Sequence, residues 1–216
     1  SASSIDLNGS ADNKQDAIDK MVALMEKRGN ISDVSVYKNA VIKREEESTT
    51  AVGGAIAIPH AKSDAVKEPG LAAMVLKNGV DYDAPDGDPV KLMFLIAAPN
   101  TKENIHLEVL SRLSTLLMDE KFSNDLINAN SADEFLSIID KAEDERAAAD
   151  AKKAANAGGA VDIVAVTACP TGIAHTYMAA ENIEKAANAK GYAIKVETRG
   201  SGGAKNVLTD DEIRQA

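Results

Sequence analysis

Two apolar runs, one in each half of the chain, restrict the fold more than any other feature of the sequence. Residues 90–97 (VKLMFLIA) lie between Pro89 and Pro99, and residues 161–168 (VDIVAVTA) precede a loop and a helical pattern. Apolar runs without strict alternation are typical of strands that helices cover on both faces of an α/β sheet. The sequence therefore predicts an α/β protein with a buried strand in each half.

Helical periodicity surrounds the first run. Residues 13–28 carry apolar side chains at helical spacing and are followed by Gly29, a residue type that often closes helices. Shorter strands are expected at 56–58 and 72–76, and a turn at 81–89. Spacing and capping residues predict four more helices in this half, at about 33–44 after Asp33, at 102–118 after Thr101, at 119–128, and from 132 to 140 or beyond with Ser131 and Glu134 as a capping box.

The stretch at 141–160 (KAEDERAAADAKKAANAGGA) contains only Ala, Gly, Asn and charged residues, so it lacks an apolar stripe for packing. Two interpretations stay open: an exposed, partly helical linker, or a continuation of the preceding helix. Both make the stretch a domain boundary. We therefore expect a first domain over 1–145, a linker over 146–160 and a second domain over 161–216.

The second domain is predicted to contain a strand at 161–168, a helix at about 173–190 and a strand at 193–198. Thr209 and Glu212 then form a capping box that opens another helix. Two strands and one full helix are too few for a complete α/β layer. We therefore expect an incomplete domain with exposed strand edges and poor order.

Composition excludes several classes of protein. The net charge is −10, from 24 Lys and Arg against 34 Asp and Glu, and such a chain is a poor nucleic-acid binder because phosphate contacts need basic side chains. A single Cys excludes an internal disulfide and a Cys-based structural metal site, and it favours a cytosolic protein. No cluster of metal ligands, signal peptide or bilayer-spanning apolar run is visible, so we expect no metal, no cofactor and no direct membrane insertion.

His60 follows the apolar run 56–58 and Pro59. Proline cannot donate to a β-ladder, so Pro59 is expected to end this strand and to leave His60 at its end. Functional side chains of α/β proteins often stand at such positions. Most histidines are nevertheless structural or simply exposed, so the position alone is weak evidence for function.

Two further residues of the first domain leave alternatives open. His106 heads a stripe of leucines at Leu110, Leu113 and Leu117, so it is either a buried, hydrogen-bonded His or an imidazole that faces the strand ends, where a helix N-terminus favours anions. Arg44 precedes three glutamates, and such a charge run is more often an exposed surface than a site.

Cys169 lies between the second apolar run and a helix. Backbone amides of such a loop can hold an anion, and the helix dipole favours a thiolate. A small buried thiol is the alternative, although the strand–loop–helix context favours a nucleophile in a phosphate-binding loop. The candidate phosphate-binding residues are Thr171, Gly172, Ile173, Ala174, His175 and Thr176.

Cysteine phosphatases carry an Arg six residues after the nucleophile, and His175 occupies that position here. The loop therefore lacks the bidentate guanidinium that such hydrolases use. This difference argues against hydrolysis and for a site that holds a phosphoryl group and transfers it.

Together these residues resemble the phosphoenolpyruvate-dependent sugar phosphotransferase system. Residues 5 to about 145 resemble its enzyme IIA domain of the fructose/mannitol type, and residues 161–216 resemble the N-terminal part of a fructose-type enzyme IIB domain. The matching positions are Glu45, Val52-Gly53, 56–61 (IAIPHA) and Asn104-x-His106-Leu107 in the first case, and 164–187 (VAVTACPTGIAHTYMAAENIEKAA) and 195–203 (KVETRGSGG) in the second.

The resemblance implies a IIA domain with a mixed β-sheet flanked by helices, followed by a truncated α/β parallel-sheet IIB domain. It implies that His60 takes a phosphoryl group from the phosphocarrier protein HPr, with His106 as a second active-site histidine and Arg44 as a phosphate-holding residue. Cys169 would receive the group from His60 and pass it to a sugar, such as fructose, in a membrane-embedded IIC domain. The family needs no metal or cofactor, and its IIC domain would tether the native protein to the inner face of the cell membrane.

Two other classes of function remain as alternatives. A IIA-like domain can act as a regulatory binding module that phosphorylation switches, but an onward acceptor such as Cys169 would then be unnecessary. A cysteine phosphatase would hydrolyse aryl phosphates, which the residue at His175 disfavours. Mannitol or a mannosyl compound remains an alternative to fructose.

Overall fold

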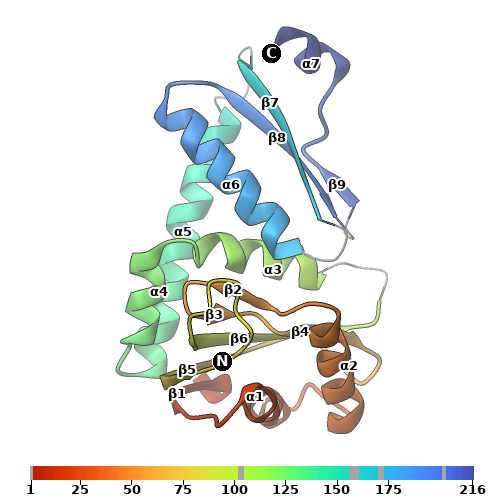
Figure 1. The fold of residues 1–216 in the computed structure, drawn as a ribbon, viewed down its shortest axis with the longest axis vertical. Coiled ribbons are helices and arrows are strands. Elements are labelled where there is room, and N and C mark those ends of the chain that lie inside the picture. Colours follow the sequence, from red (N-terminus) through yellow and green to blue (C-terminus); the bar gives the residue numbers. More distant parts are fainter. Residues whose placement is uncertain (1, 102–104, 156–160, 170–172, 201–202) are drawn as a thin grey trace. The chain divides into compact units, whose positions relative to one another are not determined.

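The computed structural model describes residues 2–101, 105–155, 161–169, 173–200 and 203–216. The chain divides into two compact units, the first formed by Ser1–Leu110 with Asp119–Ile139 and the second by Ser111–Met118 with Asp140–Ala216 (Figure 1). A 3-10 turn at Ala2–Ser4 opens the chain. The elements that follow, up to the end of the long fifth helix, are β1 (Ile5–Gly9), α1 (Lys14–Lys27), α2 (Val34–Glu47), β2 (Ala51–Gly53), β3 (Ile56–Ala57), β4 (His60–Ser63), β5 (Gly70–Val80), β6 (Val90–Pro99), α3 (Ile105–Leu116), α4 (Glu120–Ile127) and α5 (Ala132–Ala155).

The sheet of the first unit is mixed and is built around β6. Strand β5 pairs with β6 antiparallel, whereas β3 and β4 both pair with β6 parallel. Strand β1 adds to β5 in parallel, and β2 adds to β3 antiparallel. The predicted mixed sheet and its central strand are therefore confirmed.

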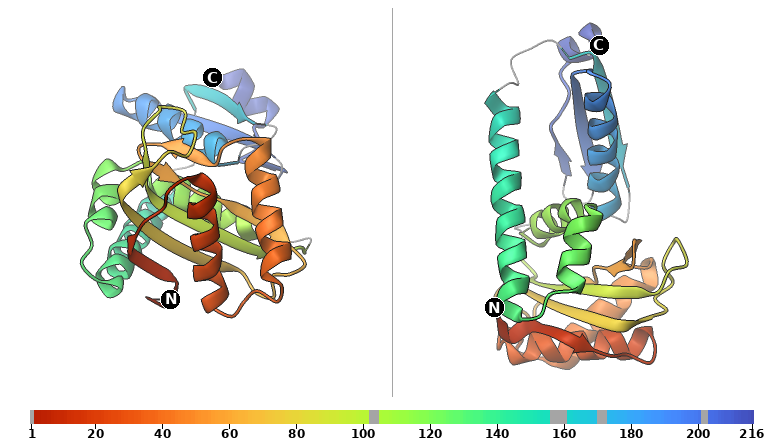
Figure 2. Two further views of the ribbon diagram at one scale, coloured as in Figure 1. Left: turned by 60° about the horizontal axis from the view of Figure 1, so that its bottom comes forward. Right: turned by 90° about the vertical axis from the view of Figure 1, so that its left-hand side faces the viewer.

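Helices cover both faces of this sheet. Helices α1 and α2 lie on one side, with α4 and the start of α5 on the other (Figure 2). On the α1–α2 side, Met93 and Leu95 of β6 join the main core, and on the other side Phe94 packs against Phe135 of α5 at 6.0 Å between ring centroids. Successive side chains of a strand point to opposite faces, which explains why β6 is apolar at almost every position.

Local capping fixes the helix ends that the sequence predicts. The Asn13 side chain caps α1 by accepting from the backbone of Asp16 at 3.0 Å, and Gly29 follows the helix with φ +82°. Asp33 and Asp119 cap α2 and α4 in the same way. Helix α5 runs unbroken to Ala155, so the stretch that follows residue 140 continues the helix that precedes it.

Two strand predictions need correction, and one further strand of the first sheet, β1, was missed. His60 does not follow the end of a strand but begins β4, because Pro59 separates two short strands that both pair with β6. Strand β5 is longer than the predicted 72–76 and extends from Gly70 to Val80. Strand β1 was not predicted, because IDLNG is short and ends in poor strand formers.

The second unit contains β7 (Ile163–Ala168), α6 (Ile173–Ala189), β8 (Ile194–Gly200), β9 (Gly203–Lys205) and α7 (Asp210–Gln215). Strands β7 and β8 are parallel, and β9 pairs with β8 antiparallel. The predicted capping box of Thr209 and Glu212 is confirmed at the start of α7. Strand β7 is less buried than predicted, because Thr167 is buried against α6 while Val166, on the opposite face, is 53% exposed.

A buried hydroxyl ties α2 to the sheet and yields the first prediction. Tyr37 is fully buried, and its Oη donates to the carbonyl of Ile96 in β6 at 3.1 Å. Replacement Tyr37→Phe should lower the free energy of unfolding of the first unit by about 1–2 kcal/mol, because the carbonyl loses a buried donor. Urea unfolding would measure this, with Tyr192→Phe at an exposed position as the control. An equal effect in both variants would contradict the prediction.

Candidate functional site

The backbone holds His60 at the first position of β4, in register with Ile96 of β6. The amide of Ile96 donates to the carbonyl of Pro59 at 3.0 Å, so the chain stays anchored to β6 where proline cannot donate. The residue is therefore fixed by a central strand rather than by a loose strand end.

Both ring nitrogens of His60 have partners. Nδ1 lies 2.8 Å from the carbonyl oxygen of Ile58, and Nε of Arg44 donates to Nε2 at 3.2 Å. A carbonyl oxygen only accepts hydrogen bonds, so Nδ1 carries the hydrogen and Nε2 presents its lone pair to Arg44. The neutral ring is thus held in one tautomer, with its lone pair on Nε2.

Arg44 lies in the last turn of α2, where it is half-buried. Its Nη1 donates to the backbone carbonyl of Ser48 at 3.0 Å and to the Ser48 hydroxyl at 3.3 Å. Glu46 and Glu47, which follow it in sequence, are exposed. The structure therefore brings Arg44 and His60 together. Arg44 is not the exposed surface residue that the charge run in the sequence favoured.

The environment keeps His60 neutral. Burial lowers the pKa of His60 below its ordinary value, and the guanidinium of Arg44 lowers it further. The Ile58 carbonyl and the more distant Glu45 and Glu47 act in the opposite direction without reversing the shift. At neutral pH Nε2 is therefore unprotonated, and its lone pair accepts the hydrogen bond from Arg44.

Glu45 matches the IIA pattern in the sequence, but the sequence analysis does not predict its burial. It is buried beside Arg44, and its carboxylate accepts from the backbone of Thr50 at 2.8 Å and pairs with Lys14 at 2.9 Å. Helical spacing could have revealed it, since Tyr37, Val41 and Glu45 recur at i, i+4 and i+8 and are the buried residues of α2.

His106 lies in α3, but its side chain is outside the described residues. The leucines predicted to share its face, Leu110, Leu113 and Leu117, are all buried. The position of the imidazole relative to His60 therefore stays a prediction.

Cys169 directly follows β7 and is partly exposed. Its amide donates to the carbonyl of Arg199 at 3.4 Å, which places Arg199, at the end of the neighbouring strand β8, beside the cysteine backbone. Arg199 was not among the predicted site residues. Its side chain is 63% exposed and pairs through Nε with the buried Glu197.

The predicted phosphate-binding residues after Cys169 divide into three groups. Thr171 and Gly172 lie outside the described residues, as does the side chain of Ile173, which begins α6. Ala174 and Thr176 are buried, and His175 between them is exposed. The hydroxyl of Thr167 in β7 donates to the carbonyl of Thr176 at 3.0 Å, so this bond connects the end of β7 to the first turn of α6.

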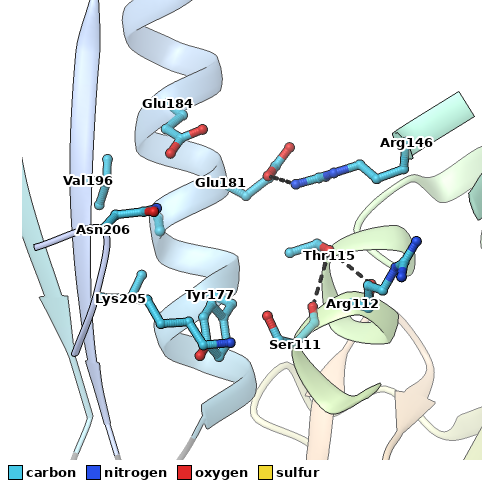
Figure 3. A pocket seen from close by; sticks show the side chains of 12 residues that line it. Ser111, Arg112, Thr115, Arg146, Tyr177, Glu181, Glu184, Val196, Lys205 and Asn206 are labelled. Carbon is cyan, nitrogen blue, oxygen red and sulfur yellow. Dashed lines mark hydrogen bonds and ion pairs between the residues drawn. The ribbon is translucent and has the colours of Figure 1, made fainter. Parts of the chain in front are cut away.

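A cavity of about 310 Å³ lies within the second unit (Figure 3). Its lining includes Tyr177, Glu181 and Lys205, and the 2.8 Å ion pair between Arg146 and Glu181 is part of its wall. None of the predicted site residues lines it, so it is not the candidate site. The described residues contain no group of three potential metal ligands and no helix long and apolar enough to cross a bilayer.

The class of protein follows from a family model. The model described as "Phosphoenolpyruvate-dependent sugar phosphotransferase system, EIIA 2" matches residues 1–142, and the chain belongs to this family. A second model, "PTS system, Lactose/Cellobiose specific IIB subunit", matches residues 164–216.

Curated relatives match nearly the whole length of this chain. The chain is 47% identical over 214 residues to the "PTS system fructose-specific EIIABC component" of Bacillus subtilis, covering 98% of this chain and 34% of the relative. It is 35% identical over 212 residues to the "PTS system 2-O-alpha-mannosyl-D-glycerate-specific EIIABC component" of Escherichia coli, covering 97% and 31% respectively. The chain thus spans about a third of the length of these relatives.

Solved structures agree with the fold of the first unit. Nitrogen Regulatory Protein IIA-Ntr of Neisseria meningitidis is 30% identical with a TM-score of 0.60, over 64% of this chain and 94% of that one. The IIA chain in a complex of enzyme IIAMTL with phosphorylated enzyme IIBMTL of Escherichia coli is 28% identical with a TM-score of 0.58, over 65% and 96%.

The pKa of His60 gives the second prediction. The ¹⁵N and ¹H NMR signals of the ring should show the Nδ1–H tautomer and a titration midpoint below about 6.5. Because folding lowers this pKa, the unfolded chain takes up the proton at higher pH, and the contribution of His60 to the free energy of unfolding decreases as pH falls below about 6.5.

The variant Arg44→Met tests the cause of this shift. Loss of the guanidinium should raise the pKa of His60, while burial still keeps it below the ordinary value. A titration midpoint above 7 for His60 in the unmodified protein would contradict the lowered pKa.

Proposed function

We propose that this chain is a phosphoryl relay of a sugar phosphotransferase system, in which His60 accepts a phosphoryl group from phosphorylated HPr and passes it to Cys169. Residues 1–145 would act as the IIA domain and residues 161–216 as part of a IIB domain. The observation that carries the proposal is the pairing at His60, which leaves Nε2 as a nucleophile directly beside a guanidinium.

The geometry at His60 suits phosphoryl acceptance without an added base. The Nε2 lone pair attacks phosphorus, the N–P bond of the donor breaks, and a new N–P bond forms on Nε2. The ring then carries a positive charge, which the Nδ1–H bond to the Ile58 carbonyl stabilises. Arg44 turns from Nε2 to the phosphoryl oxygens, and the reaction is mainly positioning and charge stabilisation.

Onward transfer to Cys169 is supported by the two family models on one chain and by the relative solved as a complex of IIA with phosphorylated IIB. The thiolate would attack phosphorus while the bond to Nε2 breaks, so that the neutral imidazole is regenerated. The sugar, bound in a IIC domain, would be the final acceptor. Fructose is the first candidate because of the fructose-specific relatives, and a mannosyl compound is the second.

A second candidate function is phosphorylation-dependent regulation. It is favoured by the likeness to the nitrogen regulatory protein of Neisseria meningitidis. The two candidates differ at Cys169, because a regulatory switch that ends at His60 needs no cysteine acceptor.

Phosphorylation of His60 is the third prediction. Incubation with phosphorylated HPr should add one phosphoryl group that is labile to acid, and His60→Ala should abolish it because the nucleophile is lost. Intact-mass spectrometry would measure uptake, and Tyr192→Phe, at an exposed position of the second unit, is the control. An acid-labile phosphate on the first domain of His60→Ala would sink the assignment.

The fourth prediction concerns the cysteine. Cys169→Ser should leave phosphorylation of His60 intact but remove onward transfer, because a hydroxyl is a far poorer nucleophile than a thiolate at neutral pH. Peptide mapping at neutral pH would locate the phosphate. Phosphate confined to His60 in both proteins would instead support the regulatory function.

A further inference from the structure

Glu45 is the most deeply buried charge near the proposed acceptor. Its side chain is 5% exposed, although the two glutamates that follow it are exposed. The carboxylate accepts from the backbone amide of Thr50 at 2.8 Å and from the Thr50 hydroxyl, and it pairs with Lys14 at 2.9 Å. The hydroxyl of Tyr82 lies 3.5 Å away. Each oxygen of this carboxylate therefore has at least two partners.

The partners of Glu45 come from three different segments. Lys14 begins α1, Thr50 precedes β2, and Tyr82 follows β5. Lys14 also pairs with Asp83 at 3.0 Å and lies 4.8 Å from the centre of the Tyr82 ring. Glu45 thus connects the end of α2 to the rest of the first unit by directional bonds.

A buried ion pair is weak evidence for stability, because desolvation of both charges offsets their attraction. Partial burial lowers the pKa of Lys14, but the bonds to Glu45 and Asp83 outweigh this effect and raise it above the ordinary value. Lys14 therefore stays charged at neutral pH. The contribution of the ion pair to the molecule is better sought in geometry than in net stability.

The geometry that Glu45 fixes is that of Arg44. Neighbouring residues on a helix point about 100° apart, so the inward orientation of Glu45 determines the direction of Arg44. The guanidinium is also held by Ser48, the C-cap of α2, three residues beyond Glu45. The backbone position of Arg44 and the hydrogen bonds of its guanidinium to Ser48 therefore both depend on the helix turn that Glu45 anchors.

We propose that Glu45 is a positioning residue for phosphoryl acceptance: held by Lys14, Thr50 and Tyr82, it fixes the last turn of α2 so that Arg44 meets Nε2 of His60. Glu45 touches neither His60 nor the incoming group and acts through Arg44. The inference rests on the proposed function of His60.

The variant Glu45→Gln tests this role, because it keeps the size of the side chain and removes the ion pair with Lys14. Its rate of phosphoryl transfer from phosphorylated HPr should fall at least about tenfold in kcat with little change in KM, since positioning errors act on the chemical step. The matched control is Glu46→Gln, which makes the same charge change at the neighbouring exposed position and should stay within about twofold of the unmodified protein. Equal losses in the two variants would overturn the proposal.

A double-mutant cycle with Arg44→Met separates positioning from a general structural role. If Glu45 acts through Arg44, Glu45→Gln should have no further effect on kcat in the Arg44→Met background. An additive loss would overturn the proposal. If Glu45→Gln does not fold, the double variant Lys14→Met/Glu45→Gln also removes the unpaired charge of Lys14. This double variant then replaces Glu45→Gln in the cycle.

The same measurements distinguish this inference from the function on which it rests. Normal transfer by Glu45→Gln, together with loss of uptake in His60→Ala, would remove the role of Glu45 and leave the relay intact. Uptake that persists in His60→Ala would remove the relay itself.

Discussion

The pairing of β6 with β5, β3 and β4 is the constraint on which the first unit depends. Strand β6 is buried on both faces, and its register brings Ile96 beside His60. Pro59 interrupts the chain that pairs with this part of β6, yet its carbonyl still accepts from Ile96. The proline therefore separates β3 from β4 without releasing His60 from the sheet. In the proposed relay this rigidity would help His60 to react, because a fixed ring loses little freedom in the reaction.

The elements that depend on local information could be predicted from the sequence. Asn13, Asp33 and Asp119 cap their helices because a short polar side chain can accept from the backbone two or three residues later. The central strand was evident from an apolar run between two prolines. The continuation of α5 was one of two open interpretations, and a stretch of Ala and charged residues has the propensity that such a helix needs.

The features that depend on distant residues could not be predicted in the same way. Strand β1 forms because it pairs with β5, with Ile5 opposite Ala73. The segment IDLNG contains no pattern that predicts this pairing. Glu45 stands in one run with Glu46 and Glu47, and although helical spacing points it inward, its contacts with Lys14 and Tyr82 depend on the folded chain. The site shows the same division. The sequence identified Arg44, His60 and Cys169 as candidate site residues. The tautomer of His60 and the position of Arg199 beside Cys169 became clear only from the folded chain.

If His60 carries a phosphoryl group as proposed, the arrangement around it also affects how that group is taken up and released. Burial keeps the imidazole neutral, and the Ile58 carbonyl directs its hydrogen to Nδ1, so Nε2 needs no deprotonation before attack. Arg44 donates to the lone pair of Nε2, so in the proposed relay its interaction with the phosphoryl group would replace a hydrogen bond that already exists. The net gain on phosphorylation is therefore smaller than an unpaired guanidinium would provide. A smaller gain leaves the phosphoryl group less tightly held, which is what transfer to a second nucleophile requires.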